Sequence, residues 1–139
     1  MNALRPDKRS IDRTDIERLV AEFYRRVRLD QRLGPIFHAH IGETDAEWAP
    51  HLKKIEDFWA NVMLKERAYS GNPMQIHMGV GELRPDDFPI WLAIFDDAAA
   101  QVLPTHKAQA FSTLAHRIGR SLSMGLAQAR AGEVPRLAG

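Results

Sequence analysis

Hydrophobic residues recur along most of the chain at the three- and four-residue spacing of amphipathic α-helices. No segment alternates apolar and polar residues as a half-buried strand does. The pattern therefore predicts an all-α fold with about four substantial helices and two short ones. The four main apolar stripes are Ile16, Leu19, Val20, Phe23, Tyr24 and Val27; His51, Ile55, Phe58, Trp59 and Val62; Phe88, Trp91, Leu92, Phe95, Ala99 and Val102; and Phe111, Leu114, Ala115, Ile118 and Leu122.

Two T-x-x-E patterns are typical of capping boxes, in which two side chains satisfy free amides at a helix start. The first joins Thr14 to Glu17 and predicts the start of the first helix. The second begins at Thr44, but Pro50 would fall inside any helix started there and would remove a hydrogen bond. We therefore expect a short turn first and a long helix from near Pro50 to around Lys65.

Proline, glycine and threonine mark the other boundaries. Residues 35–40 read as a short helical turn after Gly34, Pro85 or Pro89 opens the next long helix, and Thr105 is an N-cap for the last.

We expect one domain over residues 1–139, because this length supports a single hydrophobic core. Residues 1–13 are polar and read as a loosely held arm. The last helical pattern fades after Gly132, so residues 132–139 read as a tail.

The stretch from His51 to His77 carries two histidines on two predicted helices joined by a short connection. Asn72 is a good N-cap and Pro73 a good first helical residue, so His77 lies just past the first turn of the second helix. The two imidazoles can then face each other across a gap. Spacing alone fits two unrelated histidines, one at the surface and one in the core, at least as well.

Composition narrows the class of protein. The apolar and charged fractions, 45% and 27%, are those of an ordinary globular protein. The net charge of +1 lacks the excess of positive charge that binding to nucleic acid or an anionic membrane would need. The absence of cysteine excludes disulfides, thiol nucleophiles and thioether attachment of haem. The N-terminus lacks the apolar run of a signal peptide, and no window suits a membrane span, so we expect a cytoplasmic protein.

Several chemistries fit poorly. A G-x-S-x-G elbow, an H-E-x-x-H zinc motif and a phosphate-binding glycine loop are all absent from the sequence. The pair His38 and His40 supplies only two ligands and reads as solvent-exposed.

One kind of site does use the residues present, namely an iron macrocycle that needs a neutral nitrogen ligand, an aromatic wall and polar groups over the open iron face. His77 can supply the ligand, Phe37 the wall, and Tyr24, His51 and Trp91 the polar groups. A core tyrosine bonded to a backbone carbonyl is the alternative for Tyr24.

The sequence resembles the truncated haemoglobins, and group III of that family in particular. Six segments carry the resemblance in order: FYRRVR at 23–28, LGPIF at 33–37, W-x-x-H at 48–51, I-x-x-FWA at 55–60, Y-x-G-x-P-x-x-x-H at 69–77 and IWL at 90–92. Groups I and II typically carry Gly-Gly pairs, and this chain has none.

The resemblance implies a truncated globin fold, a 2-on-2 helical sandwich around a non-covalent haem b. His77 is then the proximal iron ligand, and Phe37 packs on the porphyrin. Tyr24 and Trp91 become distal hydrogen-bond donors. His51 stands at the distal entrance as a gate or weak donor.

Other positions carry weaker implications. Ile55, Phe58 and Met78 are possible pocket walls. Lys54 either reaches a haem propionate or is simply solvated. Trp59 fits helix packing equally well. The remaining histidines match no functional position: His38, His40, His106 and His116.

The implied function is binding of dioxygen, nitric oxide and carbon monoxide at a pentacoordinate or weakly hexacoordinate iron. Two donors that hold dioxygen tightly suit nitric oxide oxidation or peroxidase-like chemistry, supported by a reductase, better than oxygen transport. A haem-based sensor is an alternative that usually needs an attached output domain. A haem-free helical interaction module is a further alternative. We expect a monomer or weak dimer.

Overall fold

The computed structural model describes residues 11–64 and 84–138, with side chains described up to position 125 and at position 127. Within these ranges the chain is helical and has no strand, which confirms the predicted all-α class. The helices are α1 (Arg13–Leu29), α2 (Leu33–Ile41), α3 (Asp45–Leu64), α5 (Asp87–Val102) and α6 (Thr105–Ala138).

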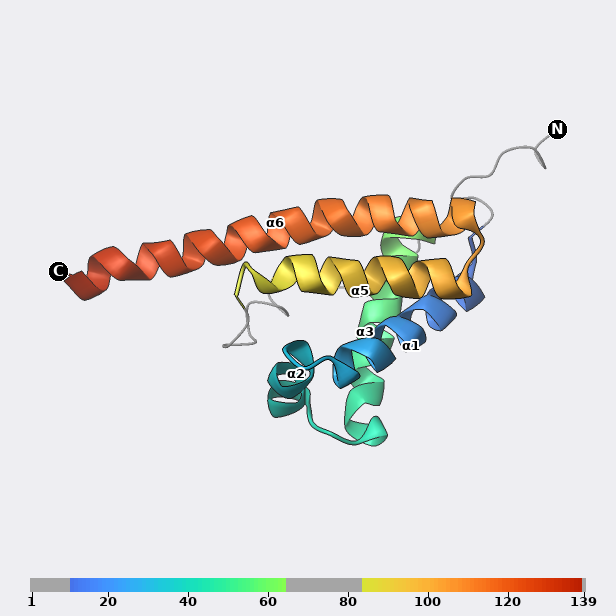
Figure 1. Ribbon diagram of the computed structural model, residues 1–139, viewed down its shortest axis with the longest axis horizontal. Coiled ribbons are helices and arrows are strands. Elements are labelled where there is room, and N and C mark those ends of the chain that lie inside the picture. Colours follow the sequence, from blue (N-terminus) through green and yellow to red (C-terminus); the bar gives the residue numbers. More distant parts are fainter. Residues whose placement is uncertain (1–10, 65–83, 139) are drawn as a thin grey trace.

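The four long helices form two layers of two (Figure 1). α5 and α6 run antiparallel, side by side, in one layer, while α1 and α3 cross each other in the other. α1 packs directly on α5, and the short α2 connects the end of α1 to α3. The predicted 2-on-2 arrangement of helices is therefore confirmed.

The capping box of α1 is not the one predicted. Asp12 is the N-cap and accepts a hydrogen bond from the N–H of Asp15 at 2.9 Å, while the Asp15 carboxylate accepts one from the N–H of Asp12 at 3.1 Å. The assignment to Thr14 and Glu17 is wrong, because the two aspartates satisfy the same kind of free amide two residues earlier.

Both predicted ends of the domain need correction. Ile11 is buried in the core and α1 begins at Arg13, so the expected loose arm over residues 1–13 is too long. At the other end α6 continues through Gly132 to Ala138 instead of fading into a tail. A glycine costs a helix interior only about 1 kcal/mol, which is not enough to end it.

The second capping box does start α3. Glu47 donates its N–H to the Thr44 hydroxyl oxygen at 3.1 Å, and the Glu47 carboxylate accepts the N–H of Thr44 at 3.1 Å. α3 therefore begins at Asp45 and runs through Pro50, so the predicted start near Pro50 is wrong. The capping box and the complete burial of Trp48 in the first turn offset the hydrogen bond lost at the proline.

α5 begins between the two prolines that the sequence offered as its start. Its first residue is Asp87, and Pro85 lies in the preceding turn. Pro89 falls in the first helical turn, where its missing N–H would lack a partner in any case. The predicted stripe faces the core: Phe88, Trp91, Phe95 and Ala99 are buried, and Leu92 and Val102 are partly buried.

Aromatic rings connect the two layers. Trp59 on α3 stacks on Phe95 of α5 with centroids 5.5 Å apart, and lies edge-on to Phe111 of α6 at 5.4 Å. Phe95 also meets Phe23 of α1 at 5.1 Å. Trp59 therefore belongs to the helix-packing core. In the part of the chain that the structure describes, no helix is both long and apolar enough to cross a membrane.

Candidate functional site

Tyr24 points into the protein from α1 and is 2% exposed. Burial raises the pKa of its hydroxyl well above the usual range for tyrosine, and hydrogen bonding with Trp91 opposes this only in part. The ring lies edge-on to Phe23, with centroids 4.7 Å apart. The phenol therefore stays protonated, and able to donate, throughout the physiological pH range.

Trp91 reaches the same region from α5, in the opposite layer. Its side chain is 7% exposed, its indole nitrogen is buried, and the indole lies near enough to the Tyr24 hydroxyl to act on the pKa of that group. The ring is edge-on to Phe23 at 5.3 Å and stacks on Phe95 at 6.2 Å. Two neutral donor groups, one from each layer, thus meet in aromatic surroundings.

His51 lies on α3 beside this pair and is half-buried. Its imidazole stands perpendicular to the Tyr24 ring, with centroids 5.6 Å apart, and perpendicular to Trp48 at 5.5 Å. The Nε2 atom is buried. His51 therefore closes one side of the donor cluster while part of its surface still reaches solvent.

Trp48 is a site residue that sequence reasoning missed. It is fully buried, and its indole N–H donates to the carbonyl of Gly42 at 2.9 Å. Its ring contacts Tyr24 at 5.9 Å and Phe37 at 6.4 Å, so it supports both. The signal was present in the second capping box, which puts Trp48 and His51 one turn apart on the same helix face.

The predicted wall residues differ in burial. Phe37 on α2 is 1% exposed and Ile55 on α3 is 4% exposed, whereas Phe58 is only partly buried. Lys54 is exposed. Phe37 and Ile55 are therefore available as buried apolar surface, and Lys54 lies on the outer surface of α3.

The expected proximal ligand His77 and the neighbouring Met78 lie outside the described residues, which resume at position 84. Among those described, no group of three or more potential ligands stands ready for a metal ion. Of the histidines without a predicted role, His116 pairs with Asp96 at 2.8 Å between α6 and α5, and His38 lies edge-on to Trp48 at 6.2 Å.

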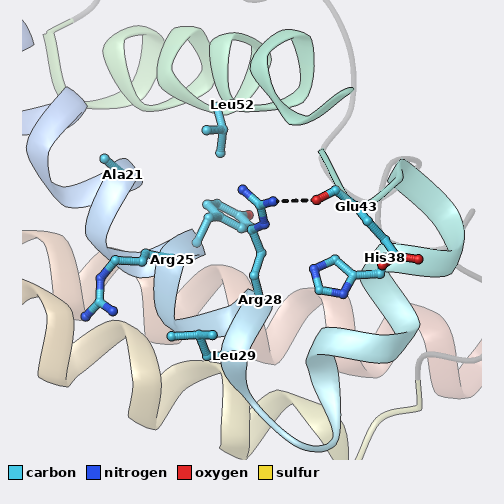
Figure 2. Close-up of a pocket in the computed structure, with 8 residues that line it drawn as sticks. Ala21, Arg25, Arg28, Leu29, His38, Glu43 and Leu52 are labelled. Atoms are coloured by element: carbon cyan, nitrogen blue, oxygen red, sulfur yellow. Dashed lines mark hydrogen bonds between the residues drawn. The ribbon is translucent and has the colours of Figure 1, made fainter. Parts of the chain in front are cut away.

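A pocket of about 350 Å³ opens beside Tyr24, between α1, α2 and α3 (Figure 2). Arg28 crosses it: its guanidinium donates to the carbonyl of Glu43 at 2.9 Å and to Asp45 at 3.0 Å, and lies 5.0 Å from the Trp48 ring centroid. Leu52 faces the pocket from α3 (Figure 2). The arginine charge is thereby neutralised at the pocket, which leaves a largely apolar hollow next to the donor cluster.

The donor set and its surroundings can be tested against a haem. A porphyrin needs apolar and aromatic walls, and an iron-bound diatomic ligand needs neutral donors that do not compete as bases. Phe37 and Ile55 provide buried apolar surface, and Tyr24 and Trp91 provide two buried donors that carry no charge. The chemistry of the described residues therefore suits one side of a haem pocket.

Two comparisons with known proteins agree. The chain is 39% identical over 89 residues to the group 3 truncated hemoglobin of Campylobacter jejuni, an alignment that spans 64% of this chain and 70% of that protein. The structure matches the crystal structure of the group III truncated hemoglobin from Campylobacter jejuni with a TM-score of 0.79 and 34% identity, over 84% of this chain and 91% of that one. No protein-family model matches the sequence. The chain belongs to the group III truncated haemoglobins, a family of globins whose cofactor is haem.

Proposed function

We propose that this globin binds dioxygen, nitric oxide and carbon monoxide at a haem b held by His77, and that Tyr24 and Trp91 donate hydrogen bonds to the ligand. The observation that carries the proposal is the meeting of these two buried, neutral donors from opposite layers of the fold. The haem iron, when bound, supplies the bond to the diatomic molecule. The protein supplies the wall, the donors and the access.

The two donors act on charge. A diatomic ligand that draws electron density from iron becomes a better hydrogen-bond acceptor, and hydrogen bonds to charged partners contribute about 1.5–3 kcal/mol each. The aromatic surroundings of Tyr24 and Trp91 keep water away and so strengthen both contacts. Because burial raises the pKa of Tyr24, its proton is retained at the pH of a cell. The site is therefore built to retain its ligand.

His51 is the proposed gate. Its ring packs against both Tyr24 and Trp48 yet keeps an exposed part, so a rotation of this side chain opens the cluster without moving a helix. Its second nitrogen can also act as a weak donor to the ligand. The largely apolar pocket beside Tyr24 is not lined by His51 and is not part of this proposed route.

Tight retention favours chemistry on the bound gas over oxygen transport. In the reaction we favour, one dioxygen and one nitric oxide combine with one electron from a reductase to give nitrate. Tyr24 and Trp91 hold the dioxygen oriented, and the buried walls at Phe37 and Ile55 exclude water from it. Peroxidase-like chemistry uses the same donors and is the alternative reaction at this site.

The test is the oxygen dissociation rate of the reduced, haem-loaded protein. Tyr24→Phe and Trp91→Phe each remove one donor, and each is expected to raise the rate roughly 10- to 100-fold, since about 1.4 kcal/mol is tenfold. Trp59→Phe is the matched control, because Trp59 is an equally buried tryptophan that packs on Phe95 and Phe111. Wild-type rates in both donor variants would remove the basis of the proposal.

A further inference from the structure

Arg32 and Asp87 form a bidentate ion pair between two turns that are far apart in the sequence. The Arg32 Nε donates to one carboxylate oxygen of Asp87 at 2.8 Å, and its Nη2 donates to the other at 3.1 Å. The N–H of Arg84 also donates to this carboxylate, at 2.8 Å. Asp87 is 4% exposed, so these contacts hold a charge that is almost fully buried.

The pair fixes the beginning of α5. Asp87 is the first residue of that helix, and the preceding Asp86 makes no side-chain cap. Burial acts to raise the pKa of Asp87, but the hydrogen bonds from Arg32 and Arg84 outweigh it, so the pKa is lowered and the carboxylate persists at neutral pH. A negative charge in the first turn also suits the positive end of the helix dipole.

The pair also links α5 to the turn between α1 and α2, where Arg32 is the N-cap of α2. Arg32 follows the end of α1, the helix of Tyr24, and Asp87 opens α5, the helix of Trp91. Asp87 and Trp91 are four residues apart and so share a helix face. A shift of the first turn of α5 along α1 therefore carries Trp91 with it, while Tyr24 stays in place.

We propose that Arg32 and Asp87 are positioning residues that fix how α5 lies along α1. In that position Trp91 and Tyr24 can donate hydrogen bonds to the same ligand. This inference rests on the donor roles proposed above. The planar guanidinium meets both carboxylate oxygens at once, so the pair resists sliding as well as separation. A lysine at position 32 keeps the charge but loses the two-point contact.

The variants follow from this geometry. Arg32→Gln removes the pair. Arg32→Lys keeps a single-point ion pair, so it still tests the proposal if Arg32→Gln fails to fold. The matched control is Arg25→Gln, because Arg25 binds Glu22 through the same two-point contact, at 2.9 and 2.8 Å, within α1 alone. The control removes the same kind of two-point contact at a more exposed position, without touching the link to α5.

Two measurements separate positioning from loss of stability, both made well below the melting temperature. The first is the indole N–H resonance of Trp91, assigned by its absence in Trp91→Phe. The second is a double-mutant cycle on the oxygen dissociation rate, combining Arg32→Gln with Trp91→Phe. We expect Arg32→Gln to move the resonance and to raise the rate roughly three- to tenfold, with Arg32→Lys intermediate and Arg25→Gln unchanged.

In the Trp91→Phe background, Arg32→Gln is expected to add nothing, because the group it positions is gone. An unmoved Trp91 resonance in Arg32→Gln, or an equal rate increase with and without Trp91, overturns the positioning role. If Trp91→Phe alone leaves the rate unchanged, the donor role fails instead. The resonance still decides whether Arg32 positions the indole, so the two failures are distinguishable.

Discussion

The imidazole of His51 stands perpendicular to the ring of Tyr24, at 90° with centroids 5.6 Å apart. The edge of one ring therefore meets the face of the other, a favourable aromatic geometry. Trp48 is also perpendicular to His51, at 89°, so the imidazole is held on two sides. His51 is half-buried, whereas Tyr24 and Trp48 are 2% and 0% exposed, so His51 is the most exposed of the three side chains.

This contact predicts the effect of opening the gate. His51→Ala removes the ring that closes the cluster, so we expect the association rate of carbon monoxide to rise roughly severalfold. His38→Ala is the control, because His38 touches Trp48 but makes no ring contact with Tyr24 among those observed. Flash photolysis measures both rates. An unchanged rate in His51→Ala, or an equal rise in the control, argues against the gate.

Acid should destabilise the fold through two buried aspartates. Burial tends to raise the pKa of Asp15, but hydrogen bonds from Lys107 and the Asp12 N–H lower that pKa overall. The pKa of Asp87 is likewise lowered overall, by its hydrogen bonds with Arg32 and Arg84. A lowered native pKa means that each carboxylate contributes stability above its ordinary pKa of 3.8, which is lost as the pH falls through the native value.

Urea unfolding between pH 7 and pH 2.5 checks this directly. The free energy of unfolding is expected to fall below about pH 4, and Asp15→Asn and Asp87→Asn are expected to flatten that fall while lowering stability at pH 7. Asp97→Asn, at an exposed position of α5, serves as the control. A fall that is equally steep in all three variants contradicts the assignment.

Glu56 on α3 is predicted to be a stabilising site for substitution. Burial raises the pKa of its carboxyl, and the nearby Glu17 adds to the shift. A raised native pKa means that the charged form costs stability at pH 7, and the cost disappears as the pH drops below the ordinary value of 4.5. Glu56→Gln should therefore raise the melting temperature at pH 7. The expected gain in the free energy of unfolding is less than about 1 kcal/mol.

The measurement is calorimetric melting of Glu56→Gln and wild type at pH 7 and at pH 3.5. The difference in melting temperature is expected to shrink at the lower pH, where Glu56 in the wild type is also protonated. A destabilised variant at pH 7 would mean that the carboxylate makes a favourable contact that outweighs burial.

Local patterns predicted much of this fold, because the buried face of a helix repeats its hydrophobic residues every three or four positions. Tyr24 and Val20 share the helical spacing of the first stripe, and both are buried as that spacing indicates. The proline rule alone misplaces the start of α3, because the capping box of Thr44 and Glu47 starts the helix ahead of Pro50. The same error hid Trp48, which lies one turn ahead of His51.

Other features have no local signature. The meeting of Tyr24 with Trp91 depends on how α1 crosses α5, and hydrophobic spacing within each helix does not encode that crossing. The chemistry of an iron-macrocycle site and the family resemblance are what indicate it. The pair Arg32 and Asp87 lies at helix starts, where charged residues usually signal solvent exposure, so periodicity gave no reason to join them.

The most direct test of the central claim is the visible spectrum of the purified, haem-reconstituted protein, reduced, before and after addition of carbon monoxide. The account predicts a ferrous haem spectrum that shifts to the histidine-ligated carbonyl form. In His77→Gly the histidine-ligated form should be lost, and added imidazole should restore it. A protein that takes up no haem, or a carbonyl spectrum that is the same without His77, would contradict the account.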